Sequence, residues 1–247
     1  MRLMMVRHAE PDYTIDSLTE KGWREAELLG RRLKDIDFAG IYASPLGRAQ
    51  DTARPMLNEK GLDFDRDVVV CDWLREFPVQ LKRPDVAPEN MIMWDWLPQD
   101  FVAREGLLLK DEWYKDPVMA EGHSKEMYDY VINGFDELLE RHGYKRNGYL
   151  YDAVEANNDT IVLFCHFGVM SVLASHLLNV SPMITLQNTC ALPSSVTIFN
   201  TEERRKGVAT FRMSCFGDTS HLYAGGEPLS FMARFCECYD NTDERHD

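Results

Sequence analysis

The chain has 247 residues and a formal net charge of −14, with 41 acidic against 27 basic side chains. That length is enough to bury a sizeable hydrophobic core, so folding requires neither disulfides nor a structural metal. Binding to nucleic acid or to an anionic membrane surface requires a basic footprint, so this charge argues against both classes of partner. A small anionic ligand stays possible, because a few arginines can converge on one pocket.

The N-terminus and the cysteines indicate a cytoplasmic protein. The apolar run at the N-terminus is too short for a signal peptide and is interrupted at once by Arg7 and His8. No stretch approaches the roughly 18 apolar residues of a membrane span. The six cysteines, Cys236 and Cys238 among them, have neither the spacing of a disulfide framework nor that of a zinc site. We therefore expect reduced thiols and no metal ion.

Short apolar runs alternate with helical patterns along the chain. The predicted elements are a strand at 3–6, a helix at 19–33, a strand at 41–43, a helix from 45 to about 57, strands at 68–70 and 160–165, a helix at 169–178, and strands at 195–200 and 211–215 joined by a polar turn at 201–207. This alternation favours an α/β fold, a three-layer sandwich with a mostly parallel central sheet.

Residues 77–122 interrupt that alternation with five prolines and three tryptophans. We expect a single domain spanning 1–247, in which 77–122 is a mostly helical insertion over the active site. Two roles remain open for the insertion. It is either a packing unit that covers part of the core or a lid that shapes the substrate pocket.

Basic and titratable side chains follow three of the predicted strands. Arg7 and His8 follow the first strand, Arg48 lies at the start of the helix after the second, and His166 follows the strand at 160–165. The carboxyl ends of strands line the ligand crevice in open α/β sheets, so these side chains are expected to meet. Arginines offer bidentate charged contacts and neutral imidazole is a nucleophile near neutral pH, which suits a tetrahedral anion.

Five segments resemble, in the same order, motifs of the histidine phosphatase superfamily, in its phosphoglycerate mutase-like branch. They are Leu3-Met4-Met5-Val6-Arg7-His8-Ala9-Glu10, Leu18-Thr19-x-x-Gly22, Ser44-Pro45-Leu46-x-Arg48-Ala49-x-x-Thr52-Ala53, Cys165-His166-Phe167-Gly168 and Gly217-Asp218-Thr219-Ser220-His221-Leu222. The resemblance implies that His8 is the phosphorylated nucleophile and that Arg7, Arg48 and His166 complete a phosphate pocket. It also implies a small phosphorylated substrate and no cofactor.

Glu76 is the candidate proton donor, since it lies where the family often places this residue, between a strand and the insertion. A carboxyl group in a partly apolar pocket has a raised pKa and can stay protonated. Asp72, Glu10 and Glu121 are the alternatives, and an ordinary exposed glutamate at position 76 is the remaining one.

Several residues depart from the family pattern. Ala9 replaces a glycine, and Thr14 stands where the family often has a phosphate-binding asparagine, although a threonine hydroxyl can still donate one hydrogen bond. Phe167 replaces a common glycine and makes the pocket wall bulkier. We predict Thr14 and Phe167 as substrate-binding residues, and His123 and His221 as structural or rim residues.

The predicted function is hydrolysis of a small phosphomonoester through a phosphohistidine on His8. The alternatives are a phosphoglycerate mutase-type phosphotransferase and a catalytically inactive phosphate-binding protein. A mutase must hold a bisphosphorylated intermediate and therefore needs extra cations, whereas Lys82, Arg83 and Arg104 are sparse in the insertion. Aromatic residues there suggest an apolar or ring-containing leaving group. The oligomeric state remains open.

Overall fold

The computed structural model describes residues 1–86, 90–230, 240–241 and 243; Cys236 and Cys238 lie outside this range. Its strands are β1 Arg2–Arg7, β2 Pro11–Asp12, β3 Ser17–Leu18, β4 Gly40–Ala43, β5 Val69–Val70, β6 Gln80–Leu81, β7 Met91–Ile92, β8 Tyr144–Asn147, β9 Leu150–Ala153, β10 Thr160–Cys165, β11 Val196–Arg205 and β12 Val208–Asp218. The α-helices are α1 Glu20–Leu33, α2 Gly47–Lys60, α3 Phe64–Asp67, α4 Pro98–Val102, α5 Pro117–Glu121, α6 Ser124–Arg141, α7 Phe167–Leu178, α8 Pro182–Asn188 and α9 Ser220–Gly225. The 3₁₀ helices are η1 Asp72–Leu74, η2 Glu105–Leu108 and η3 Trp113–Lys115.

Within the described ranges, the central sheet contains eight strands in the order β5-β4-β10-β1-β11-β12-β9-β8. The first four run parallel, whereas every pairing from β1–β11 onward is antiparallel. The prediction of a mostly parallel sheet is therefore wrong for half of the strands. The pairs β8–β9 and β11–β12 are hairpins, and a short hairpin connection can join only antiparallel strands.

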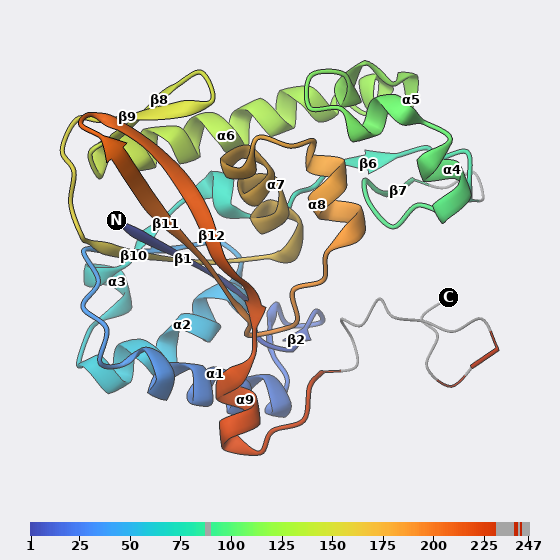
Figure 1. The fold of residues 1–247 in the computed structure, drawn as a ribbon. Coiled ribbons are helices and arrows are strands. Elements are labelled where there is room, and N and C mark those ends of the chain that lie inside the picture. The colour runs from blue at the N-terminus through green and yellow to red at the C-terminus, as the bar shows by residue number, and fades with distance from the viewer. Residues whose placement is uncertain (87–89, 231–239, 242, 244–247) are drawn as a thin grey trace.

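Helices cover both faces of the sheet, which confirms the predicted three-layer α/β sandwich (Figure 1). Side chains alternate between the faces along β1, as strand geometry requires. Leu3 and Met5 pack in the core that α6 and α7 cover, whereas Met4 and Val6 pack against α1 and α2. Burial on both faces explains why this strand reads as an uninterrupted apolar run.

The hairpin of β11 and β12 is longer than its sequence suggests. Residues 201–205, predicted as a polar turn, continue β11, and only two residues separate it from β12. The charged side chains Glu202, Arg204 and Arg212 are tolerated because they pair with one another at the surface. The predicted turn is therefore wrong, because an antiparallel ribbon can present polar side chains to solvent.

The described residues of 77–122, which leave out 87–89, contain the β6–β7 hairpin, two short α-helices and two 3₁₀ helices. The hairpin was not predicted, and the helices are shorter than a mostly helical insertion implies. Figure 1 places α4, α5 and the hairpin beside α6 and α8. The tryptophans of this segment, which lie between β7 and α4 and in η3, join the same hydrophobic core as α6 and α7, with Trp96 and Trp113 each 2% exposed.

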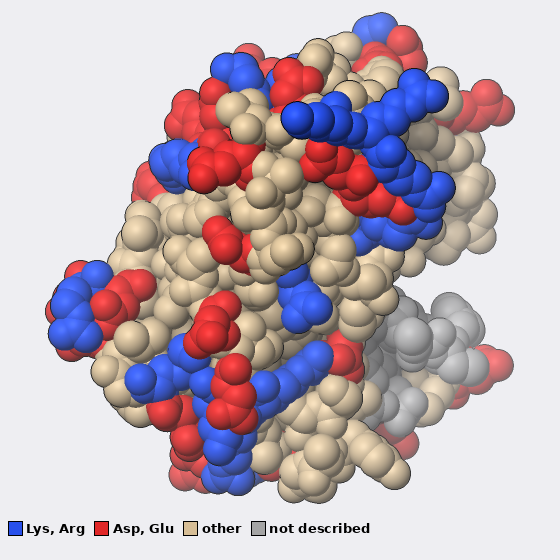
Figure 2. All heavy atoms as spheres, turned by 60° about the vertical axis from the view of Figure 1, so that its left-hand side comes forward, with Lys and Arg blue, Asp and Glu red and all other residues tan. Residues whose placement is uncertain are grey.

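Basic and acidic side chains are mixed on the face shown in Figure 2, where lysines and arginines lie beside aspartates and glutamates. Surface ion pairs include Lys145–Glu140, with 2.7 Å between nitrogen and oxygen. Among the described residues, no helix combines the length and the apolar character that crossing a bilayer would require.

Candidate active site

The four residues expected to meet lie at the carboxyl ends of neighbouring strands. Arg7 ends β1 and His8 follows it, His166 follows β10, and Arg48 lies in the first turn of α2, after β4. The imidazole rings of His8 and His166 lie with their centroids 5.1 Å apart. Parallel pairing of β1, β10 and β4 brings these ends to one edge of the sheet, as their positions in the sequence predict.

Only one nitrogen of the His8 ring, Nδ1, forms a hydrogen bond with the described residues of the protein. Its Nδ1 lies 2.8 Å from the Ala9 carbonyl oxygen, which can only accept, so Nδ1 carries the proton and donates. The lone pair of the neutral ring is therefore on Nε2. Burial and the neighbouring Arg7 lower the pKa of His8 well below its ordinary value, so the ring is neutral at neutral pH.

Three buried nitrogens of the cluster have no hydrogen-bond partner among the described residues: Arg7 Nε, Arg48 Nε and His166 Nδ1. A buried donor without a partner costs free energy, so such groups are rarely left unsatisfied in a folded protein. Three donors from three elements, two of them cationic, suit the oxygens of a tetrahedral anion.

His166 is oriented by a serine that follows β4. Its Nε2 lies 2.7 Å from Ser44 Oγ. Burial, then His8 and the two arginines, lower the pKa of His166 well below its ordinary value. The ring is therefore neutral until a substrate supplies negative charge, and with Ser44 donating to Nε2 its Nδ1 proton remains for that substrate.

Glu76 reaches the cluster from the loop after η1. Its Oε1 accepts hydrogen bonds from the backbone N–H of Phe77 at 2.8 Å and of Val169 at 3.3 Å. Burial raises the pKa of this carboxyl group, against the lowering effect of those donors and of Arg7. Because Oε1 accepts two N–H groups, the proton of the neutral acid belongs on Oε2.

The other candidate acids have partners elsewhere. Asp72 is exposed and pairs with Arg75, and Glu121 is exposed and lies 3.9 Å from Lys82. Glu10 accepts hydrogen bonds from Thr19 at 2.9 Å and from Ser230 at 2.6 Å. Among the four carboxyl groups, Glu76 alone contacts the helix that follows His166.

Asp16, Thr52 and the glycine before Arg48 support the cluster and were not predicted from the sequence. Asp16 accepts from Arg48 Nη1 at 2.6 Å and from the Gly47 N–H at 2.8 Å. A Cβ atom at position 47 would lie 2.2 Å from the Asp16 carbonyl oxygen, so only glycine fits this contact. Thr52 accepts from the Ala9 N–H at 2.9 Å, which fixes the backbone after the nucleophile candidate.

Of the two further predicted binding residues, Phe167 lies at the cluster. The Arg7 guanidinium carbon lies 5.6 Å from the Phe167 ring centroid. The Trp94 ring also packs on Phe167, with the two ring centroids 6.0 Å apart. Thr14 is exposed on the β2–β3 hairpin and donates to Asp12 at 2.5 Å. Its predicted role in substrate binding stays a prediction.

The two histidines predicted as structural or rim residues differ in their surroundings. His123 is exposed, precedes α6 and lies 3.2 Å from Glu126. His221 is buried in α9 and bonds to Ser194, whose backbone N–H donates to the His8 carbonyl oxygen at 3.1 Å. The motif around His221 is the one sequence signal that could have identified this contact.

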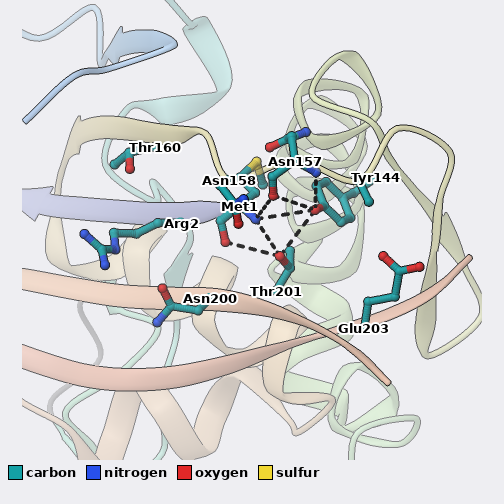
Figure 3. Close-up of a pocket in the computed structure, with 10 residues that line it drawn as sticks. Met1, Arg2, Tyr144, Asn157, Asn158, Thr160, Asn200, Thr201 and Glu203 are labelled. Atoms are coloured by element: carbon teal, nitrogen blue, oxygen red, sulfur yellow. Dashed lines mark hydrogen bonds between the residues drawn. The ribbon is translucent and has the colours of Figure 1, made fainter. Parts of the chain in front are cut away.

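A separate cavity of about 530 Å³ lies at the opposite end of β1 (Figure 3). The amino group of Met1 lies here, donating to the Asn157 carbonyl at 2.7 Å and to Thr201 Oγ1 at 2.6 Å. Arg2 and Thr160 mark this end as the amino end of the two parallel strands β1 and β10. None of the residues predicted for the site lines this cavity.

Residues 3–80 match the family model of the histidine phosphatase superfamily (branch 1). A 2,3-bisphosphoglycerate-dependent phosphoglycerate mutase of Thermoplasma acidophilum is 41% identical over 96 residues, which cover 35% of this chain and 46% of that relative. The chain therefore spans about half the length of this relative. Phosphoserine phosphatase 1 of Hydrogenobacter thermophilus is 25% identical over 228 residues, which cover 87% of this chain and 93% of that relative.

Solved structures share the fold. A phosphoserine phosphatase of Entamoeba histolytica, in complex with 3-phosphoglyceric acid, superposes with a TM-score of 0.56 at 18% identity, covering 90% of this chain and 98% of that one. A mycobacterial glucosyl-3-phosphoglycerate phosphatase gives a TM-score of 0.56 at 18% identity, covering 87% and 98%. The family match over residues 3–80 thus confirms the resemblance of this part of the chain to the histidine phosphatase superfamily, and the solved structures share its fold.

Proposed function

We propose that the chain is a phosphatase that hydrolyses a small phosphomonoester through a phosphohistidine on His8. The observation that carries this is the set of buried donors that have no partner in the described part of the chain, around a neutral imidazole whose Nε2 is available. The two arginines and His166 bind the phosphoryl oxygens, and Nε2 attacks phosphorus. As the N–P bond forms and the bond to the leaving oxygen breaks, Glu76 Oε2 gives its proton to that oxygen.

The second half of the reaction reverses the roles of Glu76. The carboxylate takes a proton from water, whose oxygen attacks phosphorus. The P–N bond breaks, which releases inorganic phosphate and restores neutral His8 with a protonated Glu76. A carboxyl group whose pKa is raised by burial suits both tasks, because it is protonated before the first step and basic before the second.

We propose that 77–122 forms the wall of the pocket that receives the leaving group. The leaving oxygen lies on the side of the proton donor, and Glu76 Oε1 and the Trp94 ring both come within 2.7 Å of the point where a Cβ of residue 168 would stand. Trp94 also lines a cavity of about 670 Å³ together with Met91, Trp96, Phe101, Leu108 and Leu186. The cavity is also lined by the charged side chains of Arg83 and Asp95 and by the polar side chains of Gln187, Asn188 and Thr189. Its aromatic and aliphatic part favours a leaving group that contains a ring.

The charges of the insertion favour a phosphatase over a mutase. Arg83 directs its donors to both oxygens of Asp85 and to the carbonyls of Ile92, Trp94 and Asp95. The other basic side chains of 77–122 also have partners: Lys82 with Glu121, Arg104 with Asp116, Lys110 with Asn179 and Lys115 with Glu112. The buried Arg83 in particular has its donors committed to these partners, whereas a bisphosphorylated intermediate would need cations for its second phosphate.

Relatives named as phosphatases support this reading over a binding protein without activity. The test is release of inorganic phosphate from para-nitrophenyl phosphate in the presence of EDTA by the wild type, His8→Ala and His123→Ala. His123 is a matched control, because its side chain is 74% exposed. We expect the rate of phosphate release to fall by more than about 1000-fold in His8→Ala and to stay unchanged in His123→Ala.

Activity that EDTA abolishes, or that His8→Ala retains, would contradict the proposal. With 3-phosphoglycerate, we expect glycerate and inorganic phosphate, whereas 2-phosphoglycerate as the product would identify a mutase. For the leaving-group wall, Trp94→Ala should raise KM for phenyl phosphate by about 3- to 10-fold and leave that for methyl phosphate unchanged. Equal effects on both substrates would contradict the assignment of this wall.

A further inference from the structure

A tight turn at residues 192–195, immediately before β11, holds the backbone of the nucleophile candidate. The turn closes through a 3.0 Å hydrogen bond from the Ser195 N–H to the Leu192 carbonyl. The Ser194 N–H donates to the His8 carbonyl oxygen at 3.1 Å, and the His8 N–H donates to β10 at 2.9 Å. Both backbone polar groups of His8 are therefore fixed by neighbouring segments.

Ser194 adopts a conformation that serine rarely takes. Its φ is +59°, in the left-handed region that favours glycine. In the turn 192–195, Pro193 is the second residue and Ser194, with its positive φ, is the third. These are the features of a type II turn, whose third residue is usually glycine or asparagine. Ser194 is completely buried, so the contacts of its side chain decide whether this conformation persists.

The side chain of Ser194 is held by His221. Ser194 Oγ lies 3.1 Å from His221 Nε2, and His221 is only 6% exposed. On its other side, His221 Nδ1 lies 3.3 Å from Arg32 Nη1, and Arg32 forms an ion pair with Asp218. The contacts thus run from α1 and β12 through α9 to the turn.

The protonation of His221 follows from these partners. An arginine only donates, so Nδ1 accepts and the proton of the neutral ring lies on Nε2, from which it is donated to Ser194 Oγ. Burial and Arg32 lower the pKa of His221 to about 4, although Asp218 opposes this effect. At neutral pH the ring is therefore neutral, in the one tautomer that can bond to both partners.

We propose that His221 is a positioning residue of the phosphatase site. By bonding to Ser194 Oγ it holds the turn in its left-handed conformation, and through the Ser194 N–H it fixes the His8 backbone from which the attacking imidazole projects. This inference rests on the proposed function, since it assigns to His221 the alignment of that nucleophile.

The test compares four variants with the wild type on para-nitrophenyl phosphate. His221→Leu removes the hydrogen bond and should lower kcat by at least about tenfold, because misplacement of a reacting group is costly. The inhibition constant of inorganic phosphate should stay within about twofold, since Arg7 and Arg48 are retained. His221→Gln should recover most of kcat, because an amide can accept from Arg32 and donate to Ser194.

The route through Ser194 is tested in a second background. Glycine adopts a positive φ without strain, so Ser194→Gly should be close to wild type, and adding His221→Leu to it should cost less than about threefold. Equal losses for His221→Leu in both backgrounds, or no rescue by glutamine, would overturn the proposal.

A readout without turnover separates this proposal from the proposed function. The Nδ1 proton of His8, which is hydrogen-bonded to the Ala9 carbonyl, should exchange slowly with solvent in the wild type and fast in His221→Leu, as measured by NMR. A wild type without hydrolysis would refute the phosphatase assignment, whereas unchanged protection in His221→Leu would refute the positioning role.

Discussion

Replacing Gly168 by alanine would insert a Cβ atom between the proton donor candidate and the wall of the insertion. This atom would lie 2.7 Å from Glu76 Oε1 and 2.7 Å from Trp94 Cη2, whereas ordinary contacts are at 3.4 Å or more. Both contacts must therefore lengthen by roughly 0.7 Å, through movement of the two side chains or of the backbone of residue 168. Trp94 is 7% exposed and packs on Phe167, so we expect the carboxyl group of Glu76 to move.

The effect on stability and the effect on catalysis differ in size. Alanine gains about 1 kcal/mol in helix propensity over glycine, and overpacking costs about 1–3 kcal/mol. Gly168→Ala should therefore lose at most about 2 kcal/mol in the free energy of unfolding, measured in urea. A displaced proton donor should cost about 100-fold in kcat/KM on an alkyl phosphate, whose leaving oxygen requires the proton.

The assay is the ratio of kcat/KM for methyl phosphate to that for para-nitrophenyl phosphate, whose leaving group departs as a stable anion. We expect this ratio to fall by at least tenfold in Gly168→Ala, because only the first substrate depends on Glu76. Gly106→Ala is the matched control, since no atom lies within 4 Å of a Cβ built at that position. An unchanged ratio in a folded Gly168→Ala protein would refute the reasoning.

Three further predictions concern carboxyl groups of the fold. Glu76 has a raised pKa and donates in its protonated form, so kcat/KM on methyl phosphate should fall as pH rises through that raised pKa; Glu76→Gln should lack this decline, and an identical profile would contradict the role. Glu25 is buried, and its pKa is raised from 4.5 to about 7, so the folded protein binds more protons at this group than the unfolded chain does. The free energy of unfolding should therefore fall as pH rises from about 4.5 to about 7. At about 1.4 kcal/mol per pKa unit, Glu25→Gln should gain up to about 3 kcal/mol at pH 8 in urea unfolding, whereas exposed Glu27→Gln should not. Arg83 and Asp85 form a buried ion pair, so Arg83→Met should cost about 3–5 kcal/mol by stranding a carboxylate. Arg83→Met with Asp85→Leu should cost less, and equal losses would show that the charge pair is not the cause.

The residues that the sequence predicted correctly to lie together share a physical signal. Arg7, His8 and His166 each stand at the end of an apolar run, and strand direction then dictates where they meet. Arg48 adds a third segment to the same edge. The predicted strands at 3–6 and 160–165 lie within β1 and β10, because buried parallel strands read as continuous apolar runs.

Other features depend on contacts that no local pattern specifies. Helix α6 was not predicted, although Val131, Ile132, Phe135, Leu138 and Leu139 follow helical spacing and all are buried. The contacts of Asp16 with Arg48 and of Ser44 with His166 join segments 32 and 122 residues apart. Side chains so distant become partners only through the tertiary fold.

The antiparallel direction of β11 has a consequence for when the protein becomes active during synthesis. Since β11 runs against β1, the loop before β11, rather than the loop after it, reaches the edge that carries His8. A nascent chain that ends before residue 190 already contains the charged cluster but neither the turn nor α9. Residues 192–225, which contain the turn, β11, β12 and α9, must therefore leave the ribosome and dock before the site is complete. Long-range pairing of this kind is slow to form, so enzyme activity should appear only after translation of the whole fold.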